Sequence, residues 1–218
     1  MDSPLETNPL GKRDRQKRDR EQRILGAARH LFDRKGYADT GMEDIARRAN
    51  LAVGTLYNYF PSKDDLLLAI FRRDSERVIA LGERILATPP ADAVEAIAAL
   101  ADAFIQSVAA EERMLWREVF AASIASPDAL GARMFALDAR VIEMFAAMIE
   151  KLKERGQLAA GTDSARAAGL LYGICLTWSI AYATQPNLTF EMMSSEISQS
   201  VSMAVRGMLP RAKEENLR

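Results

Sequence analysis

Residues 40–63 constrain this chain more than any other segment, because they predict two short helices, a tight turn and a fixed stop. Apolar residues recur at spacings of three and four over residues 42–49, which is the period of one helical face. Asn50 tolerates the left-handed backbone that a turn requires, and Pro61 ends the second helix. The spacing therefore predicts a helix-turn-helix.

Polar residues predict where the helices of this segment begin. Thr40 and Glu43 form a capping-box pattern, in which the hydroxyl accepts a first-turn N–H and the carboxylate reaches back. We therefore expect Thr40 to start the first helix. Ser62 and Asp65 form a similar start for a later helix, which places Lys63 in a first turn. There the lysine charge and the helix dipole would together attract a phosphate.

The second helix of the pair, residues 53–59, is expected to turn Leu56 and the following Phe60 inward and to carry no charge on its outward face. Hydroxyls, an amide and a branched apolar group suit base edges and phosphate oxygens. The residues expected to contact DNA are Thr40, Val53, Gly54, Thr55, Tyr57, Asn58, Tyr59 and Lys63. For the two tyrosines, packing inside the small domain is the alternative.

Four motifs in residues 23–67 read ILGAARHLFDRKGY, TGMEDIARRA, GTLYNYF and PSKDDLL in chain order. Their combination resembles the tetracycline-repressor (TetR) family of bacterial transcription regulators. The resemblance implies an all-helical homodimer that binds a palindromic operator and releases it when a small molecule enters the C-terminal domain. One departure is Ala52-Val53, where the family commonly has serine and a polar residue. We therefore expect this recognition helix to lack a side-chain cap and to favour thymine methyl groups.

Composition predicts an all-α fold. The chain has 218 residues and 49% hydrophobic content, which excludes a mainly disordered protein, and β-type alternation is almost absent. We expect a three-helix helix-turn-helix domain followed by a larger helical ligand-binding and dimerisation domain, with about nine helices. The expected boundaries are 1–17 for a disordered basic arm, 18–65 for the DNA-binding domain and 66–218 for the rest.

Positive charge concentrates in the N-terminal part. Residues 1–63 hold 13 Lys or Arg against 9 Asp or Glu, although the whole chain has a net charge of −1. A solvated helix start is one reading of the basic run at residues 12–23. Beside a helix-turn-helix, we favour contacts to phosphates, with the arm reaching into a minor groove.

The C-terminal part predicts helices at about 91–109, 111–125, 128–155, 162–185 and 189–209, after a break at Pro89-Pro90. Aromatic and methionine residues are frequent there. Most are expected in the core, but pockets are lined by the same residue types. The residues expected to contact a ligand are Phe104, Trp116, Phe120, Phe145 and Trp178. That ligand would be small and hydrophobic or aromatic.

Residues 167–183 carry no charge, at the lower length limit for a membrane span. Small and polar residues at four-residue intervals, including Gly169 and Gly173, instead favour close packing against another helix, so no membrane partner is expected. With the last helix, this segment predicts a four-helix dimer interface. The residues expected in it are Gly169, Gly173, Thr177, Val201, Val205 and Met208.

The inventory argues against an enzyme. The chain has one histidine and one cysteine, no glycine-rich phosphate loop and no metal-ligand cluster, so we expect no cofactor, no metal and a cytoplasmic location. The prediction is a DNA-binding regulator, a repressor released by a hydrophobic effector. One alternative is an architectural or cell-division DNA-binding protein with a protein partner and no small-molecule inducer. Activation instead of repression also stays open.

Overall fold

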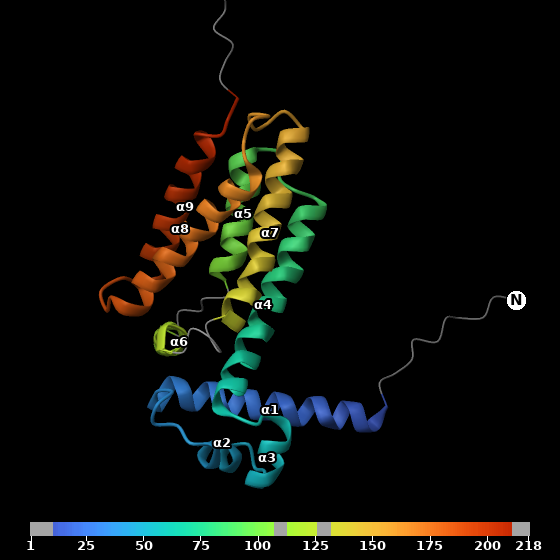
Figure 1. Cartoon of the computed structure of the whole chain (residues 1–218), viewed down its shortest axis with the longest axis vertical. Helices are drawn as coiled ribbons and strands as arrows, with labels where there is room; N and C mark the ends of the chain where they lie inside the picture. The colour runs from blue at the N-terminus through green and yellow to red at the C-terminus, as the bar shows by residue number, and fades with distance from the viewer. Residues whose placement is uncertain (1–10, 107–112, 126–131, 211–218) are drawn as a thin grey trace, which may run out of the picture. The chain divides into compact units, whose positions relative to one another are not determined.

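The computed structural model describes residues 11–106, 113–125 and 132–210, and every regular element in these ranges is an α-helix (Figure 1). The all-α fold class predicted from the sequence is confirmed, with a helix-turn-helix ahead of a larger helical part. The chain divides into two compact units, residues 1–70 and 71–218. The division falls inside one continuous helix, α4 (Lys63–Ala87).

The first unit contains α1 (Lys12–Lys35), α2 (Met42–Arg48), α3 (Val53–Tyr59) and the first two turns of α4. Helix α2 packs against both α1 and α3. The core of the first unit is made of fully buried side chains from all four helices. They are Ile24, Ala28, Phe32, Ile45, Ala46, Leu56, Leu66 and Leu67.

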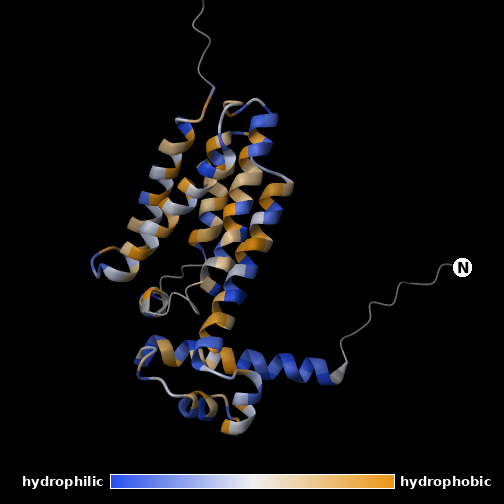
Figure 2. Ribbon diagram, viewed as in Figure 1, coloured by the Kyte–Doolittle hydropathy of each residue, from blue (hydrophilic) through white to orange (hydrophobic). Residues whose placement is uncertain are grey.

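Helix α1 begins at Lys12, so the prediction of a disordered arm was wrong for residues 12–17. Long charged side chains lose little rotamer freedom in a helix, and Asp14 in the first turn complements the helix dipole. Residues 1–10 of the expected arm lie outside the described residues. Figure 2 shows hydrophilic residues filling the N-terminal half of this helix.

Left-handed backbone occurs where the turn was predicted. Asn50 has a φ of +54°, and the N–H of the next residue, Leu51, donates to the carbonyl of Ala46 at 2.9 Å. Gly36 has a φ of +85° just after α1 and donates its N–H to the Phe32 carbonyl. The turn at Asn50 is therefore confirmed, and these residues fix the angles at which α2 and α3 follow α1.

The second unit contains the remainder of α4, α5 (Ala93–Ile105), α6 (Arg113–Ala125), α7 (Ala132–Glu154), α8 (Ser164–Thr184) and α9 (Phe190–Arg206). Helix α8 packs against α7 and α9, and α5 packs against α9 and α7. Three helices begin with side-chain caps. Asp92 caps α5, Asp163 caps α8 and Thr189 caps α9. The breaks predicted at Pro89-Pro90 and near residue 186 separate the helices as expected.

Helix α8 is long and apolar enough to cross a membrane by length and composition, with a mean hydropathy of 1.3. Such a helix also serves as the central helix of a folded domain. Here Leu171, Cys175 and Ser179 lie on a face that is buried within the second unit. We therefore describe α8 as a core helix with one face left open.

Candidate functional site

Helix α3 presents an uncharged outward face. Val53 and Tyr57 are 37% and 48% exposed, and Gly54 and Asn58 are also exposed. Thr55 and Tyr59 are half-buried, while Leu56 is fully buried and holds the helix to the unit. A Cβ placed on Gly54 would meet no atom within 4 Å, so this side of α3 is open. The face could therefore approach another molecule closely.

The inward residues of α3 lie as predicted. Leu56 is 0% and Phe60 7% exposed, and the Phe60 N–H donates to the Leu56 carbonyl at 2.9 Å. Ala52 begins the helix without a side-chain cap, which confirms the expectation for this residue. The helix therefore depends on burial of Leu56 and Phe60 for its position.

Thr40 does not start α2, and that prediction was wrong. The helix begins after Gly41, which has no side chain to act as a cap. Thr40 is 1% exposed, and its hydroxyl donates to the carbonyls of Gly36 (2.7 Å) and Leu31 (3.2 Å) at the end of α1. Because the hydroxyl is buried and already bonded inside the protein, we remove Thr40 from the set of DNA contacts.

Lys63 also differs from the prediction. Its ammonium donates to the carbonyls of Tyr37 (2.6 Å), Thr40 (3.1 Å) and Ala38 (3.2 Å). The same nitrogen lies 4.4 Å from the centre of the Tyr37 ring. An ammonium group has three N–H donors, and all three have acceptors here. Lys63 therefore joins the start of α4 to the loop between α1 and α2, and offers no free donor to a phosphate.

Tyr37 and Asp64 complete this connection. The Tyr37 hydroxyl donates to the Asp64 carboxylate, and its ring packs against Phe32 with centroids 5.1 Å apart. Burial, followed by the hydrogen bond to Asp64, raises the pKa of Tyr37 above its ordinary value. Sequence reasoning missed this pair. The signal was Lys63, a cation in the first turn of a helix, which needs compensation by nearby acceptors.

The Ser62 cap on α4 is confirmed. The Asp65 N–H donates to the Ser62 hydroxyl oxygen at 3.1 Å, and the Ser62 hydroxyl donates to the Asp65 carboxylate at 2.7 Å. This cap, Lys63 and Asp64 fix the first turn of α4 within the helix-turn-helix unit. In the first unit, the loop between α1 and α2 is therefore bonded both to the end of α1 and to the start of α4.

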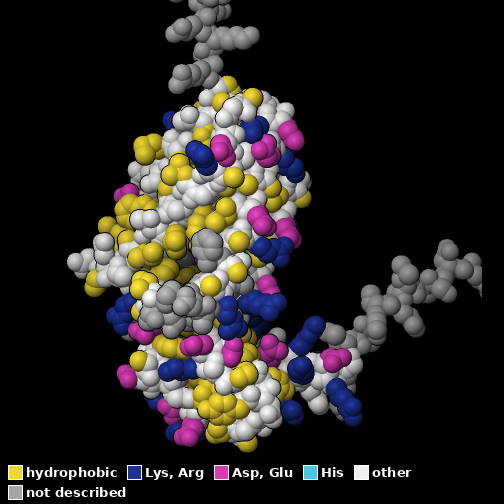
Figure 3. Space-filling view, in the orientation of Figure 1, with side chains coloured by type: hydrophobic (Ala, Val, Ile, Leu, Met, Phe, Trp, Pro, Cys, Tyr) yellow, Lys and Arg dark blue, Asp and Glu magenta, His cyan; other side chains and the backbone are white. Residues whose placement is uncertain are grey.

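Basic side chains cover the N-terminal half of α1. The exposed ones are Arg13, Arg15, Lys17, Arg18, Arg20 and Arg23. Figure 3 shows Lys and Arg side chains gathered along this part of the molecule. Because helix placement spaces these charges along about three turns, they form an extended positive surface and not a flexible arm.

The residues predicted to contact a ligand fall into three places. Phe104 and Phe145 are 6% and 1% exposed and belong to the core of the second unit. Trp116 and Phe120 lie together on α6, and Trp178 lies on α8. Of the five, Trp116 and Phe120 form a ring pair, whereas Phe104 and Phe145 are residues of the core against which Trp116 and Trp178 pack.

A polar pair lies inside the second unit beside Phe104. The Tyr172 hydroxyl donates to the half-buried Asp138 carboxylate, and the Phe104 and Tyr172 rings meet edge-on at 5.9 Å. Burial raises the pKa of Asp138, against the hydrogen bond from Tyr172, which lowers it. Burial also raises the pKa of Cys175 to about 12, so this thiol is unreactive at neutral pH.

The residues predicted for a dimer face differ in how far they are buried. Gly169 and Thr177 are exposed, and Gly173 and Met208 are half-buried. Val201 and Val205 are 0% exposed, so their assignment to the interface was wrong. They point into the chain's own core, because α9 packs that face against α5 and α8.

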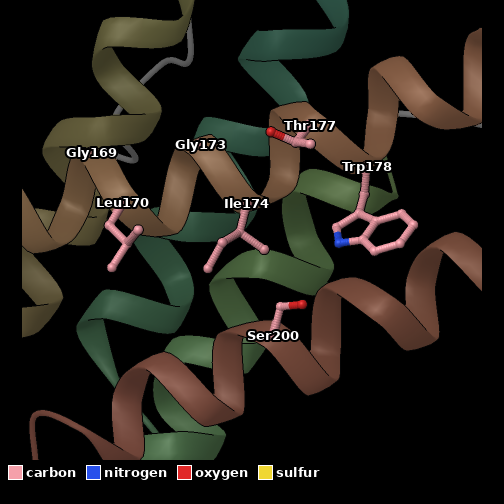
Figure 4. A pocket seen from close by; sticks show the side chains of 7 residues that line it. All are labelled: Gly169, Leu170, Gly173, Ile174, Thr177, Trp178 and Ser200. Atoms are coloured by element: carbon pink, nitrogen blue, oxygen red, sulfur yellow. The ribbon is translucent and has the colours of Figure 1, made fainter.

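The open face of α8 and α9 instead forms a groove of about 420 Å³. Its lining residues are Gly169, Leu170, Gly173, Ile174, Thr177, Trp178 and Ser200. In Figure 4 the side chains of Leu170, Ile174 and Trp178 extend from α8 toward α9, where Ser200 faces them. Trp178 therefore lies in a surface groove, and not in an enclosed pocket with the other predicted ligand residues.

The first unit is similar in sequence to known proteins. Residues 24–70 match the family model for bacterial regulatory proteins of the tetR family. The repressor KstR of Mycolicibacterium smegmatis is 45% identical over 67 residues, which cover 31% of this chain and 33% of KstR. The chain therefore matches about a third of the length of this curated relative.

Solved structures resemble a larger part of the chain. A TetR-family regulator from Mesorhizobium loti has a TM-score of 0.72 and 24% identity, over 88% of this chain and 98% of its own. The repressor FadR of Thermus thermophilus, solved with lauroyl-CoA, has a TM-score of 0.67 and 23% identity. This likeness covers 90% of this chain and 98% of the FadR chain. At these identities the likeness establishes the fold. The match over residues 24–70 and the relatives that share it indicate a bacterial regulatory protein of the tetR family.

Proposed function

We propose that this chain is a transcription regulator that reads duplex DNA with the outward face of α3. The observation that carries the proposal is the exposed, uncharged set of Val53, Gly54, Tyr57 and Asn58 on a short helix anchored by buried Leu56. The major groove admits such a helix. An asparagine amide can pair with adenine, and a branched apolar group can contact the thymine methyl group. Gly54 lets the backbone come close.

Phosphate contacts come from two groups of side chains in this proposal. The basic residues of α1 supply charge, which makes affinity depend steeply on salt. Thr55, Tyr57 and Tyr59 supply hydroxyls that fix the position of α3 on the duplex. Lys63 and Thr40 act indirectly, because they hold the frame that carries α3.

The proposed active form is a homodimer on a palindromic operator. The support is the open face of α8 and α9, where Leu170 and Met203 are 54% and 74% exposed beside the small residues Gly169 and Gly173. Small residues let a second helix approach closely, and exposed apolar residues gain from being covered. Two copies of α3 would then read two half-sites about one helical turn of DNA apart.

Release by a small apolar effector completes the proposal. FadR of Thermus thermophilus was solved with lauroyl-CoA, and in the second unit of this chain the aromatic residue Trp116 of α6 contacts Phe71 of α4. Since α4 runs without a break from the first unit into the second, an effector that displaces α4 would alter the placement of α3. Repression is the direction we propose, after the KstR repressors that share the first unit.

A fluorescence anisotropy titration on the DNA flanking the gene tests the proposal. We expect tight, salt-sensitive binding that weakens in Asn58→Ala, because one base contact is lost, with little change on unrelated DNA. The double variant Arg15→Ala/Arg18→Ala should reduce the salt slope by about two. The matched control is Arg155→Ala, an exposed arginine in the second unit, which should leave the slope unchanged.

Two results would count against this function. Equal weakening on specific and unrelated DNA in Asn58→Ala would remove α3 as the reader of sequence. Binding that no hydrophobic compound releases would favour the architectural alternative, in which the partner of the second unit is a protein.

A further inference from the structure

An aromatic cluster in the second unit contains a hydrogen-bond donor without an acceptor. The Trp116 ring on α6 meets the Phe71 ring of α4 edge-on at 4.9 Å and lies 5.7 Å from Phe120. Trp116 packs partly buried against the core of the unit, and its Nε1 atom is shielded from solvent. Among the residues that the structure describes, no group accepts a hydrogen bond from this N–H.

Such a donor is uncommon, because more than about 90% of buried polar groups in folded proteins have a partner. An indole N–H can only donate. A group that satisfies it must therefore be an acceptor, and it must approach an indole whose ring already contacts the Phe71 and Phe120 rings. Two apolar rings next to the indole favour a binding molecule that is otherwise apolar.

Charges on α6 indicate that the acceptor is neutral. The Arg113 guanidinium donates to the carbonyls of Gln185, Pro186 and Leu188 and stacks over the Tyr182 ring at 4.2 Å. The other arginine of this helix, Arg117, pairs with Glu118 at 3.5 Å. Both cations of α6 thus have partners, so this helix offers no free counter-charge to a carboxylate beside Trp116. A carbonyl oxygen of a ketone, ester or amide meets the requirement.

We infer that Trp116 donates its indole N–H to the neutral carbonyl of an otherwise apolar effector that lies against Phe71 and Phe120. The inference rests on the proposed function, since it assigns the effector class for the same regulator. It also connects the effector to α4 through Phe71, the first residue of the second unit. Phe104, Phe145 and Trp178 have no part in this site.

The test compares 1-phenyl-1-alkanones with alkylbenzenes of equal chain length, as a series from two to ten chain carbons. Binding is measured on the full chain without DNA, by isothermal titration and by the indole ¹H–¹⁵N resonance of Trp116. The spectrum of Trp178→Phe assigns that resonance, because the chain has only two tryptophans. We expect the best ketone to bind about tenfold more tightly than its hydrocarbon. Only the ketone should move the indole proton downfield.

Trp116→Phe is the matched variant, because it keeps an aromatic ring and removes the N–H. It should bind ketone and hydrocarbon alike. The inference is overturned if no ketone of the series binds, if ketones bind no better than hydrocarbons, or if Trp116→Phe keeps the preference. If the variant fails to fold, the indole shift in the unsubstituted protein decides alone. Failure of DNA binding in the separate anisotropy assay would overturn the proposed function and leave this binding result intact.

Discussion

The Lys63 ammonium lies 2.6 Å from the main-chain oxygen of Tyr37, so a lysine in the first turn of α4 donates to the loop that follows α1. A cation in a first turn opposes the helix dipole. Here three carbonyl oxygens and the face of the Tyr37 ring offset that cost. The contact joins the beginning of α4 to the frame that carries α3, and it gives Lys63 a structural role in the free protein.

Lys63→Ala is therefore expected to destabilise the first unit by about 1–2 kcal/mol, because three carbonyls lose a charged donor. Chemical denaturation measures the loss. The salt slope of DNA binding should stay nearly constant. Lys17→Ala is the opposite control, because this exposed residue of α1 should lower the slope by about one without loss of stability. A stable Lys63→Ala protein with a reduced slope would place the ammonium on a phosphate.

Gly54→Ala should separate stability from DNA binding. Its new Cβ meets nothing within 4 Å, and alanine favours a helix over glycine by about 1 kcal/mol, so the first unit should become slightly more stable. In the proposed complex the same methyl group would stand between α3 and the bases, so operator affinity should fall about tenfold or more. Gly26→Ala on α1, which also meets nothing, is the control for stability. Unchanged affinity in Gly54→Ala would argue against close approach of α3.

Local patterns were sufficient to predict much of the first unit. Asn50 and Leu56 depend on turn chemistry and helical period within a few residues, and both lie as predicted. Thr40 could not be placed in this way, because its hydroxyl bonds to carbonyls of α1 that are up to nine residues earlier in the chain. The predicted phosphate contact of Lys63 was wrong for the same reason, since the carbonyls that accept from its ammonium lie more than 20 residues away in the sequence.

The second unit shows a different limit of sequence reasoning. Helical spacing identified Val201 and Val205 as an apolar stripe, but the same spacing serves a stripe that packs inside the chain and one that packs on a partner. The exposed face of α9 carries Met203 in a mostly polar surrounding and was not predicted. On α8 the small residues did indicate the open face, because a helix otherwise rich in leucine and isoleucine has little reason to interrupt its packing with glycine.

Gly173→Leu should weaken dimerisation and leave the subunit folded. A Cβ at Gly173 meets no atom within 4 Å, so the chain itself has room, whereas a closely packed partner helix would not. Analytical ultracentrifugation across a dilution series should show a lower dimer fraction with unchanged helicity. Val201→Ala provides the contrast, because it removes buried core volume and should cost about 1–2 kcal/mol of stability without a direct effect on assembly. If Gly173→Leu dimerises like the unsubstituted protein, the dimer uses another face.

The contribution of Asp138 to the stability of the second unit should be smaller at neutral pH than at acid pH. Burial raises its pKa in the folded state above the unfolded value of about 4, so the folded chain holds this proton to a higher pH. The stabilising contribution is full below pH 4 and is lost as pH rises through the raised pKa.

Asp138→Asn keeps an oxygen that can accept from Tyr172 and removes the charge. We therefore expect the variant to be more stable than the unsubstituted protein at pH 7, with a difference that shrinks toward pH 4. Urea denaturation at both pH values measures this difference. A variant that is destabilised equally at both would show that the geometry of the Tyr172 hydrogen bond outweighs the buried charge.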